Sequence, residues 1–219
     1  LTFAAELKRI TIMDIKKITR EEALHRWKHS LEIKHEWERK VAERWANEDQ
    51  QKLLLYDKDS LEDINRKSPY KITLNNGDFD FTTDSGTRYS VSFLEDVPLG
   101  GCDTYQFGFR KREDTHSGYD ALVKNTLIAI IEQFFAENAN VLLYICDTSD
   151  GREAKRNRLF VRWFEEFATP ERFTMKTANA TVEGQGFYAA IIVENNNPML
   201  EAVVSDFKQT AESLTGEKP

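Results

Sequence analysis

Six residues that could bind a ligand lie where a continuous apolar run, VLLYIC, gives way to the segment DTSDGREAKR. Ligands often bind outside the carboxyl end of a central strand, and two arginines four positions apart on one helix face can receive the same anionic group. The segment also suits a helix cap, a glycine turn and a solvated face, with the thiol as a small buried residue. Both interpretations stay open. The candidate pocket residues are Cys146, Asp147, Ser149, Asp150, Arg152 and Arg156.

A second group of candidates lies in RKREDTHSGYDAL, which joins a predicted strand to a predicted helix. Basic side chains and a glycine beside a helix N-terminus can attract a phosphate, because the helix dipole and the main-chain N–H groups favour anions there. Glu113 and Asp114 oppose this attraction. The alternative is an ordinary surface loop. The candidate cofactor-binding residues are Lys111, Arg112, His116, Ser117 and Gly118.

Two further patterns lie in the N-terminal part of the chain. His25 and His29 have the spacing of two metal ligands on one helix face, but no third ligand supports them, so we expect no metal site. Trp27, Trp37 and Trp45 form a series of indole side chains. This series is either a surface that binds a partner protein or the seam by which the helix packs on its own domain.

Composition and charge limit the classes of function. The chain has 219 residues, of which 40% are apolar, and a net charge of −7. We therefore do not expect nucleic acid as a partner, and no apolar run approaches the ~18 residues of a membrane span. Two cysteines make no disulfide scaffold and we find no secretory signal, so we expect a cytoplasmic protein. Met13 would be a natural start, and we expect residues 1–12 to be weakly structured. We expect a protein partner or self-association through the N-terminal helices.

The spacing of apolar residues predicts the elements. Residues 19–52 are predicted to be helical, with a capping box at Thr19 and Glu22, and a six-residue gap in the apolar stripe predicts two helices or a kink near 34–36. A second helix is predicted from about Ser60. Period-two spacing over 75–111 predicts three antiparallel strands with one buried face. A long helix, a central strand, another helix, a two-stranded hairpin and a last helix follow.

The fold class is therefore α+β, with a helical N-terminal arm and linker over 1–68 and an α+β domain over 69–219. The long helix and the central strand should bury one group of apolar side chains together. These are Leu127, Ile131, Phe135, Leu143 and Ile145.

From Asn75 to Asn195 the order of elements, with its mixed sheet, resembles that of the GNAT acetyltransferase superfamily. The resemblance implies that a glycine-rich loop before the long helix holds the pyrophosphate of coenzyme A or acetyl-CoA. That loop contains a single glycine here, Gly118. The resemblance also implies a tyrosine as general acid on the helix after the central strand, where this chain has Phe160. A restriction-endonuclease-like core has a related order, but the strand TYQFGFRK lacks the acid and lysine that such a core needs to hold Mg²⁺.

The segment LLYICDTSDGREAKRNRLFVRWF, after a helix that ends in EQFF, resembles a bacterial domain family of unknown function. Together these resemblances predict a bacterial protein with a GNAT-like domain that lacks acetyltransferase activity, needs no cofactor and acts in protein binding or assembly. One alternative is an active acyl-CoA-dependent N-acyltransferase with a non-standard coenzyme A loop. Another is an antitoxin or a phage-defence component.

Overall fold

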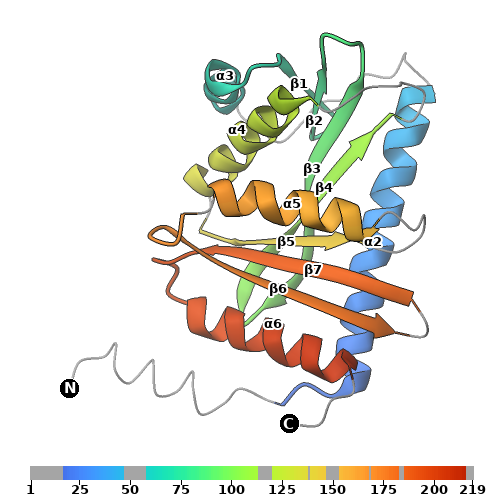
Figure 1. The fold of residues 1–219 in the computed structure, drawn as a ribbon, viewed down its shortest axis with the longest axis vertical. Helices are drawn as coiled ribbons and strands as arrows, with labels where there is room; N and C mark the ends of the chain where they lie inside the picture. The colour runs from blue at the N-terminus through green and yellow to red at the C-terminus, as the bar shows by residue number, and fades with distance from the viewer. Residues whose placement is uncertain are drawn as a thin grey trace. The chain divides into compact units, whose positions relative to one another are not determined.

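The computed structural model describes residues 17–46, 58–112, 120–137, 139–146, 153–167, 169–182 and 185–215. Within these ranges the chain forms helices and strands in the order α2 (Arg20–Ala46), α3 (Lys58–Lys67), β1 (Ile72–Asn75), β2 (Asp78–Thr82), β3 (Arg88–Leu99), β4 (Cys102–Lys111), α4 (Ala121–Glu137), β5 (Val141–Cys146), α5 (Glu153–Phe167), β6 (Phe173–Val182), β7 (Gln185–Glu194) and α6 (Leu200–Thr215) (Figure 1). None of the helices described is long and apolar enough to cross a membrane.

The strands form one seven-stranded mixed sheet in the order β1-β2-β3-β4-β5-β7-β6. Strands β5, β7 and β6 pair antiparallel, and so do β1, β2 and β3. Helix α4 connects the neighbouring strands β4 and β5, as a crossover helix does. The predicted α+β class is confirmed, and the elements from β2 to β7 follow one another in the order expected from the sequence.

By their contacts the described residues divide into two compact units. The first unit takes residues from 1–31, 95–105 and 140–219, and the second takes residues from 32–94 and 106–139. Helix α2 and strands β3 and β4 therefore contribute to both units. The bounds of these units do not coincide with the predicted boundary after residue 68, and that boundary stays a prediction.

The first unit packs two layers of apolar side chains on strands β5, β7 and β6. Leu143 and Ile145 of β5 join Trp27 of α2 and Phe207 of α6 in one buried cluster. The other face of β5 carries Tyr144, which stacks on Phe160 of α5 with ring centroids 3.5 Å apart. Because successive side chains of a strand point to opposite faces, the continuous apolar run of β5 is explained by burial on both faces.

In the second unit, strands β2, β3 and β4 are also covered on both faces. Phe93 stacks on Phe134 of α4, with ring centroids 4.6 Å apart. The alternate residues face α2 instead, where Trp37, Val41 and Trp45 cluster with Leu94. The expectation of a single buried face is therefore wrong. Ser90, on the face opposite to that of Tyr89 and Val91, is fully buried, and its hydroxyl donates a hydrogen bond to Asp80 (2.6 Å).

Helix α2 is continuous through residues 34–36, so the prediction of two separate helices is wrong. The capping box at its start is confirmed: Thr19 Oγ1 accepts from the Glu22 N–H (3.2 Å), and Glu22 Oε2 accepts from the Thr19 N–H (2.9 Å). The gap in the apolar stripe has another cause. Leu31 is the last helix residue of the first unit, and Trp37 belongs to the second. Each half of the helix has an apolar stripe that packs in its own unit. The gap in the stripe therefore marks the place where the helix passes from the first unit to the second.

Two further features of the fold were not predicted correctly. Strand β1 was missed, although the Asn76-Gly77 dipeptide before β2 is a strong hairpin signal; both residues have positive φ, 54° and 87°. The five predicted core residues are all buried, but Leu143 and Ile145 belong to the cluster with α6 and the first half of α2. The sequence does not show which β5 side chains lie on which face of the sheet, because an apolar run contains no polar residue that marks one face.

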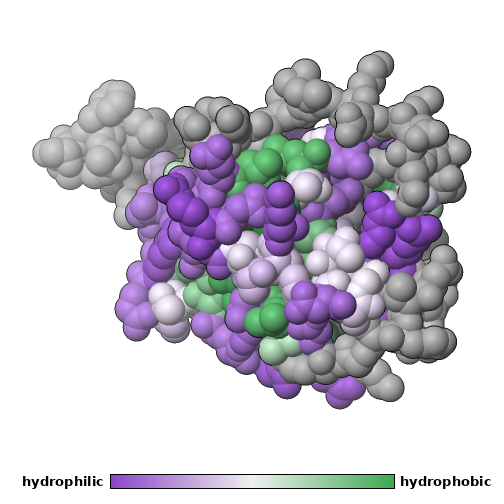
Figure 2. Space-filling view, turned by 90° about the horizontal axis from the view of Figure 1, so that it is seen from above, coloured by the Kyte–Doolittle hydropathy of each residue, from purple (hydrophilic) through white to green (hydrophobic). Residues whose placement is uncertain are grey.

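Polar side chains cover most of the surface seen in Figure 2, where hydrophobic residues are visible only in small separate areas. Among the described residues, Leu122 is the large apolar side chain that is exposed, to 41%. Among the described residues, this face therefore shows no broad apolar surface.

Candidate functional site

Asp120 occupies the N-terminus of α4, the place where the fold resemblance expects the coenzyme pyrophosphate. Its Oδ1 accepts from the main-chain N–H of Leu122 (2.9 Å), which makes it the cap of the helix. Its Oδ2 accepts from the hydroxyl of Tyr70 (2.7 Å). This hydrogen bond, together with burial, raises the pKa of Tyr70. The Tyr70 ring stacks on Phe81, so the side chain that donates to the carboxylate is held in place.

The predicted cofactor loop is only partly within the described residues. Lys111 ends β4 and Arg112 follows it; both side chains are half-buried, and the Arg112 N–H donates to the Arg88 carbonyl (3.0 Å). The other three candidates, His116, Ser117 and Gly118, lie outside the described residues, so their binding role stays a prediction.

The candidate pocket after β5 is also partly outside the described residues. Cys146 is buried and is paired in register with Tyr188 of β7. Arg156 lies in α5, and its side chain is outside the described part. The remaining candidates, Asp147, Ser149, Asp150 and Arg152, lie outside the described residues. Their role as a pocket stays a prediction.

Phe160 stands where the fold resemblance expects a tyrosine. Its ring is 7% exposed and lies between Tyr144 and Phe164, with the centroid of Phe164 at 4.2 Å. A phenylalanine has no proton to donate, so this position supplies packing and no acid chemistry.

The indole and imidazole side chains of α2 have different surroundings. Trp27 is buried in the first unit, and Trp37 and Trp45 are buried in the second. This burial is the packing alternative of the sequence analysis; partner binding by the three tryptophans stays a prediction. His25 and His29 stack with ring centroids 6.5 Å apart. The described residues contain no group of three His, Cys, Asp or Glu that could hold a metal ion.

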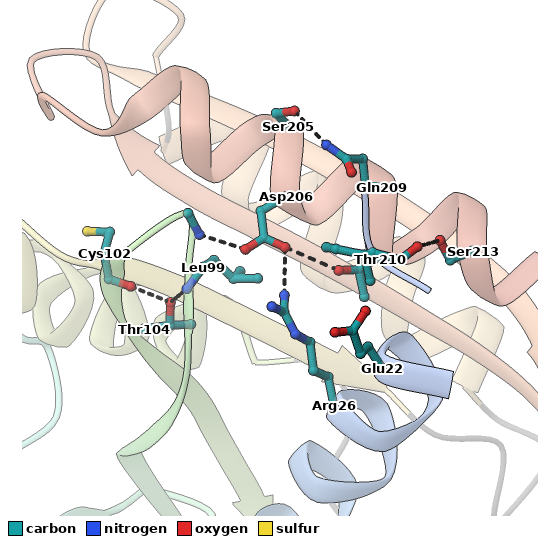
Figure 3. A network of polar contacts seen from close by, with 12 residues as sticks. Glu22, Arg26, Leu99, Cys102, Thr104, Ser205, Asp206, Gln209, Thr210 and Ser213 are labelled. Carbon is teal, nitrogen blue, oxygen red and sulfur yellow. Dashed lines mark hydrogen bonds and ion pairs between the residues drawn. The ribbon is translucent and has the colours of Figure 1, made fainter. Parts of the chain in front are cut away.

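A polar network in the first unit centres on Asp206 of α6 (Figure 3). Arg26 of α2 donates to its Oδ1 at 2.6 Å, and the N–H of Gly100 donates to its Oδ2 at 2.8 Å. One carboxylate thus holds a helix and the β3–β4 turn on α6. Gly100 has a φ of 57°, and a Cβ on it would lie 2.4 Å from the carbonyl carbon of Ala202. The close approach of the turn to α6 therefore requires glycine.

Beside this network lies a cavity of about 60 Å³. Its walls are mostly apolar and include Trp27, Ile145 and Phe207, with Arg26 and Asp96 among the polar lining residues. Since one water occupies about 30 Å³ of liquid, the cavity has room for about two water molecules or a small apolar group and is too small for a cofactor.

Asp96 is the buried carboxylate of this cavity. Its Oδ1 accepts from the hydroxyl of Ser30 (3.0 Å) and from the N–H of Val97 (2.7 Å). Burial raises the pKa of Asp96, and the two hydrogen bonds oppose that rise without cancelling it. The charged form of this side chain is therefore less favourable in the folded chain than in water.

Sequence reasoning missed Asp120, Tyr70, Asp206 and Arg26. A signal existed for Asp120, because an aspartate directly before an apolar helical run is a typical N-cap. No comparable signal existed for the ion pair, since Arg26 and Asp206 are 180 positions apart.

Part of the chain is similar to a family of unknown function. Residues 119–209 match the model of the "Family of unknown function (DUF6169)". No curated protein is significantly similar in sequence. A solved structure, described as "a CoA-dependent acyl-homoserine lactone synthase, MesI", is 12% identical over 92% of this chain and 95% of that chain, with a TM-score of 0.31.

Proposed function

We propose that this chain is a non-catalytic binding and assembly protein built on a GNAT-like fold, and that it does not hold coenzyme A at the N-terminus of α4. The single observation that carries the proposal is the position of Asp120. Its carboxylate caps α4 and is held by the hydroxyl of Tyr70.

The reason is electrostatic. A diphosphate binds at a helix N-terminus because unpaired N–H groups and the positive end of the dipole face it. Here the N–H of Leu122 is already bonded to a carboxylate, and that carboxylate would lie beside the diphosphate with the same sign of charge. Glu113 and Asp114 add two further negative charges in the sequence just before it. The carboxylate at the helix N-terminus and the two acidic residues of the preceding sequence therefore argue against binding of the coenzyme A pyrophosphate.

The chemistry after binding supports the same conclusion. An N-acyltransferase of the resembled superfamily often protonates its leaving thiolate with a tyrosine on the helix after the central strand. This chain has the buried ring of Phe160 there, stacked on Tyr144. The described residues therefore do not offer that proton donor at the expected place.

Titration calorimetry with acetyl-CoA tests the proposal. We expect no binding tighter than about millimolar. The variant Asp120→Asn keeps an N-cap side chain and removes the charge, so it should bind acetyl-CoA about two- to fivefold more tightly than the natural chain in an NMR titration. Asp103→Asn, at an exposed position in the first unit, is the charge-matched control and should change nothing.

Micromolar affinity of the natural chain, abolished by Gly118→Asp or Lys111→Glu, would overturn the proposal and favour an active acyltransferase. Equal acetyl-CoA affinities of the natural chain and Asp120→Asn would remove the observation on which the proposal rests. A thermal-shift measurement gives an independent check, because a ligand at a hundred times its Kd adds about 2.7 kcal/mol to the free energy of unfolding.

A further inference from the structure

Strand β6 forms one edge of the sheet and is long, regular and almost uncharged. It pairs with β7 over all ten residues, from Phe173 opposite Glu194 to Val182 opposite Gln185, with no interruption in register. No described residue pairs with its other side. Proteins usually protect such an edge by shortness, proline, charge or a bulge, because its main-chain groups can pair with another strand. From Met175 to Thr181 the only charge is on Lys176, and there is no proline.

One hydrogen bond fixes which main-chain groups of β6 face outward. The N–H of Asn195 donates to the carbonyl of Arg172 (2.8 Å), so this carbonyl faces β7, and the N–H of Phe173 in the same peptide unit points the opposite way. In an antiparallel pair this direction alternates along the strand. The main chains of the odd-numbered residues therefore face the open edge. The N–H of Phe173, which donates to the Thr169 carbonyl (2.8 Å), agrees with this assignment. The outward-facing residues are Met175, Thr177, Asn179 and Thr181.

We propose that β6 pairs with β6 of a second copy of this chain, antiparallel, about a two-fold axis at Ala178. This register places Thr177 opposite Asn179 of the other copy, and each such facing pair exchanges two main-chain hydrogen bonds. The small side chains of Ala178 meet at the axis. The side chains of Thr177 and Asn179 are exposed, so no buried group has to move.

Charge favours this register over its neighbours. Lys176 carries the only charge between Met175 and Thr181. In this register it lies opposite Ala180 of the other copy. The two copies of Lys176 are therefore four positions apart along the paired strands, or about 14 Å at about 3.4 Å per residue. That distance exceeds the screening length of about 8–10 Å at ordinary salt, so the two charges do not oppose pairing. A register centred on Lys176 would place the lysines directly opposite each other. The strand is therefore self-complementary.

In the proposed assembly function, the partner would be a second copy of this chain. The role of the dimer rests on that proposed function. The two can fail separately, because acetyl-CoA binding and the mass of the complex are measured independently. Sedimentation of the full chain at concentrations up to about 1 mM should give twice the chain mass of 25.4 kDa. A monomer throughout this range would overturn the proposal, and an extended peptide of another protein would then be the alternative occupant of the edge.

Two charge variants test the register. T177E/N179E places like charges opposite each other across the axis and should weaken the dimer about tenfold. T177K/N179E places each new lysine opposite a new glutamate and should restore the dimer. K71E, at an exposed position just before β1, changes the net charge as much as T177E/N179E does and should leave the mass unchanged.

Thermal melting of each variant shows whether it is folded. A dimer that survives T177E/N179E, or equal loss in both double variants, would overturn pairing through this edge.

Discussion

The first half of α2 is held in the first unit by polar contacts as well as by the buried ring of Trp27, whereas the second half is held in the second unit largely by indole rings. In the first half, Arg26 pairs with Asp206 and Ser30 donates to Asp96. In the second half, the Trp37 ring packs against Gly108 and its Nε1–H donates to Asp78 (3.0 Å), and the guanidinium of Arg110 lies 5.9 Å from the Trp45 ring centroid.

The difference shows that one helix can be fixed in two ways along its length. Indole packing depends on buried area and shape, so its contribution to the free energy of unfolding changes little with pH or salt. Ion pairs and buried carboxylates depend on charge, and the environment of each one decides whether it stabilises the chain. Substitutions in the two halves should therefore differ in size and in their dependence on pH.

The largest effect is expected from Trp37→Ala. It removes a buried aromatic ring and leaves Asp78 without its indole donor, so the free energy of unfolding should fall by about 3–5 kcal/mol in urea denaturation. Trp37→Phe is the matched control, because it keeps most of the ring and loses only the hydrogen bond; its loss should be about 1 kcal/mol. Equal losses for the two variants would show that the hydrogen bond to Asp78 contributes more than the packing of the indole ring, and the second half of α2 would then be held by polar contacts.

A smaller loss is expected from Asp206→Asn. The amide keeps an acceptor for the Gly100 N–H but loses the charge that faces Arg26, so the cost should be about 2–3 kcal/mol. A double-mutant cycle with Arg26→Gln isolates the ion pair. If the two losses add without coupling, Arg26 and Asp206 do not stabilise each other and the polar description of the first half is wrong.

Ser30→Ala should cost about 1 kcal/mol, because it removes one neutral donor from a buried carboxylate. Since that donor lowers the pKa of Asp96, its removal should also move the pKa further above the ordinary value. An NMR titration of the Asp96 carboxyl carbon in the natural chain and the variant checks the direction. A lower pKa in the variant would contradict the assigned hydrogen bond.

The smallest effect is expected from Asp96→Asn, and its sign depends on pH. The folded pKa of Asp96 is raised above its ordinary value of 3.8, so the unfolded chain loses this proton first as the pH rises. The natural chain should therefore lose stability above about pH 4 relative to the variant, until the folded carboxyl has also ionised. Urea denaturation of both chains at several pH values measures the difference. A difference that moves the other way would show that the charged carboxylate stabilises the first unit.

The sequence predicted the elements whose side chains repeat regularly. The period of α4 and the apolar run of β5 were sufficient, because burial along one element leaves a local pattern. It was harder to predict which face of the sheet a side chain occupies and which distant residues it contacts. Leu143 was assigned to the wrong group because β5 is apolar on both faces, and the break in the α2 stripe resembled the end of a helix. In the candidate site, Asp120 had a local signal, whereas Asp206 receives its partners from distant parts of the chain.

The contact between Trp37 and Gly108 has a consequence for how this sequence can vary. A Cβ at position 108 would lie 3.0 Å from Cζ3 of the Trp37 ring, so an added methyl group there would need the indole to shift. In relatives of this chain, a side chain at the position of Gly108 should occur together with a smaller residue at the position of Trp37. These two positions, far apart in the sequence, should therefore co-vary. In an alignment of relatives, this joint change would indicate where helix α2 packs on strand β4.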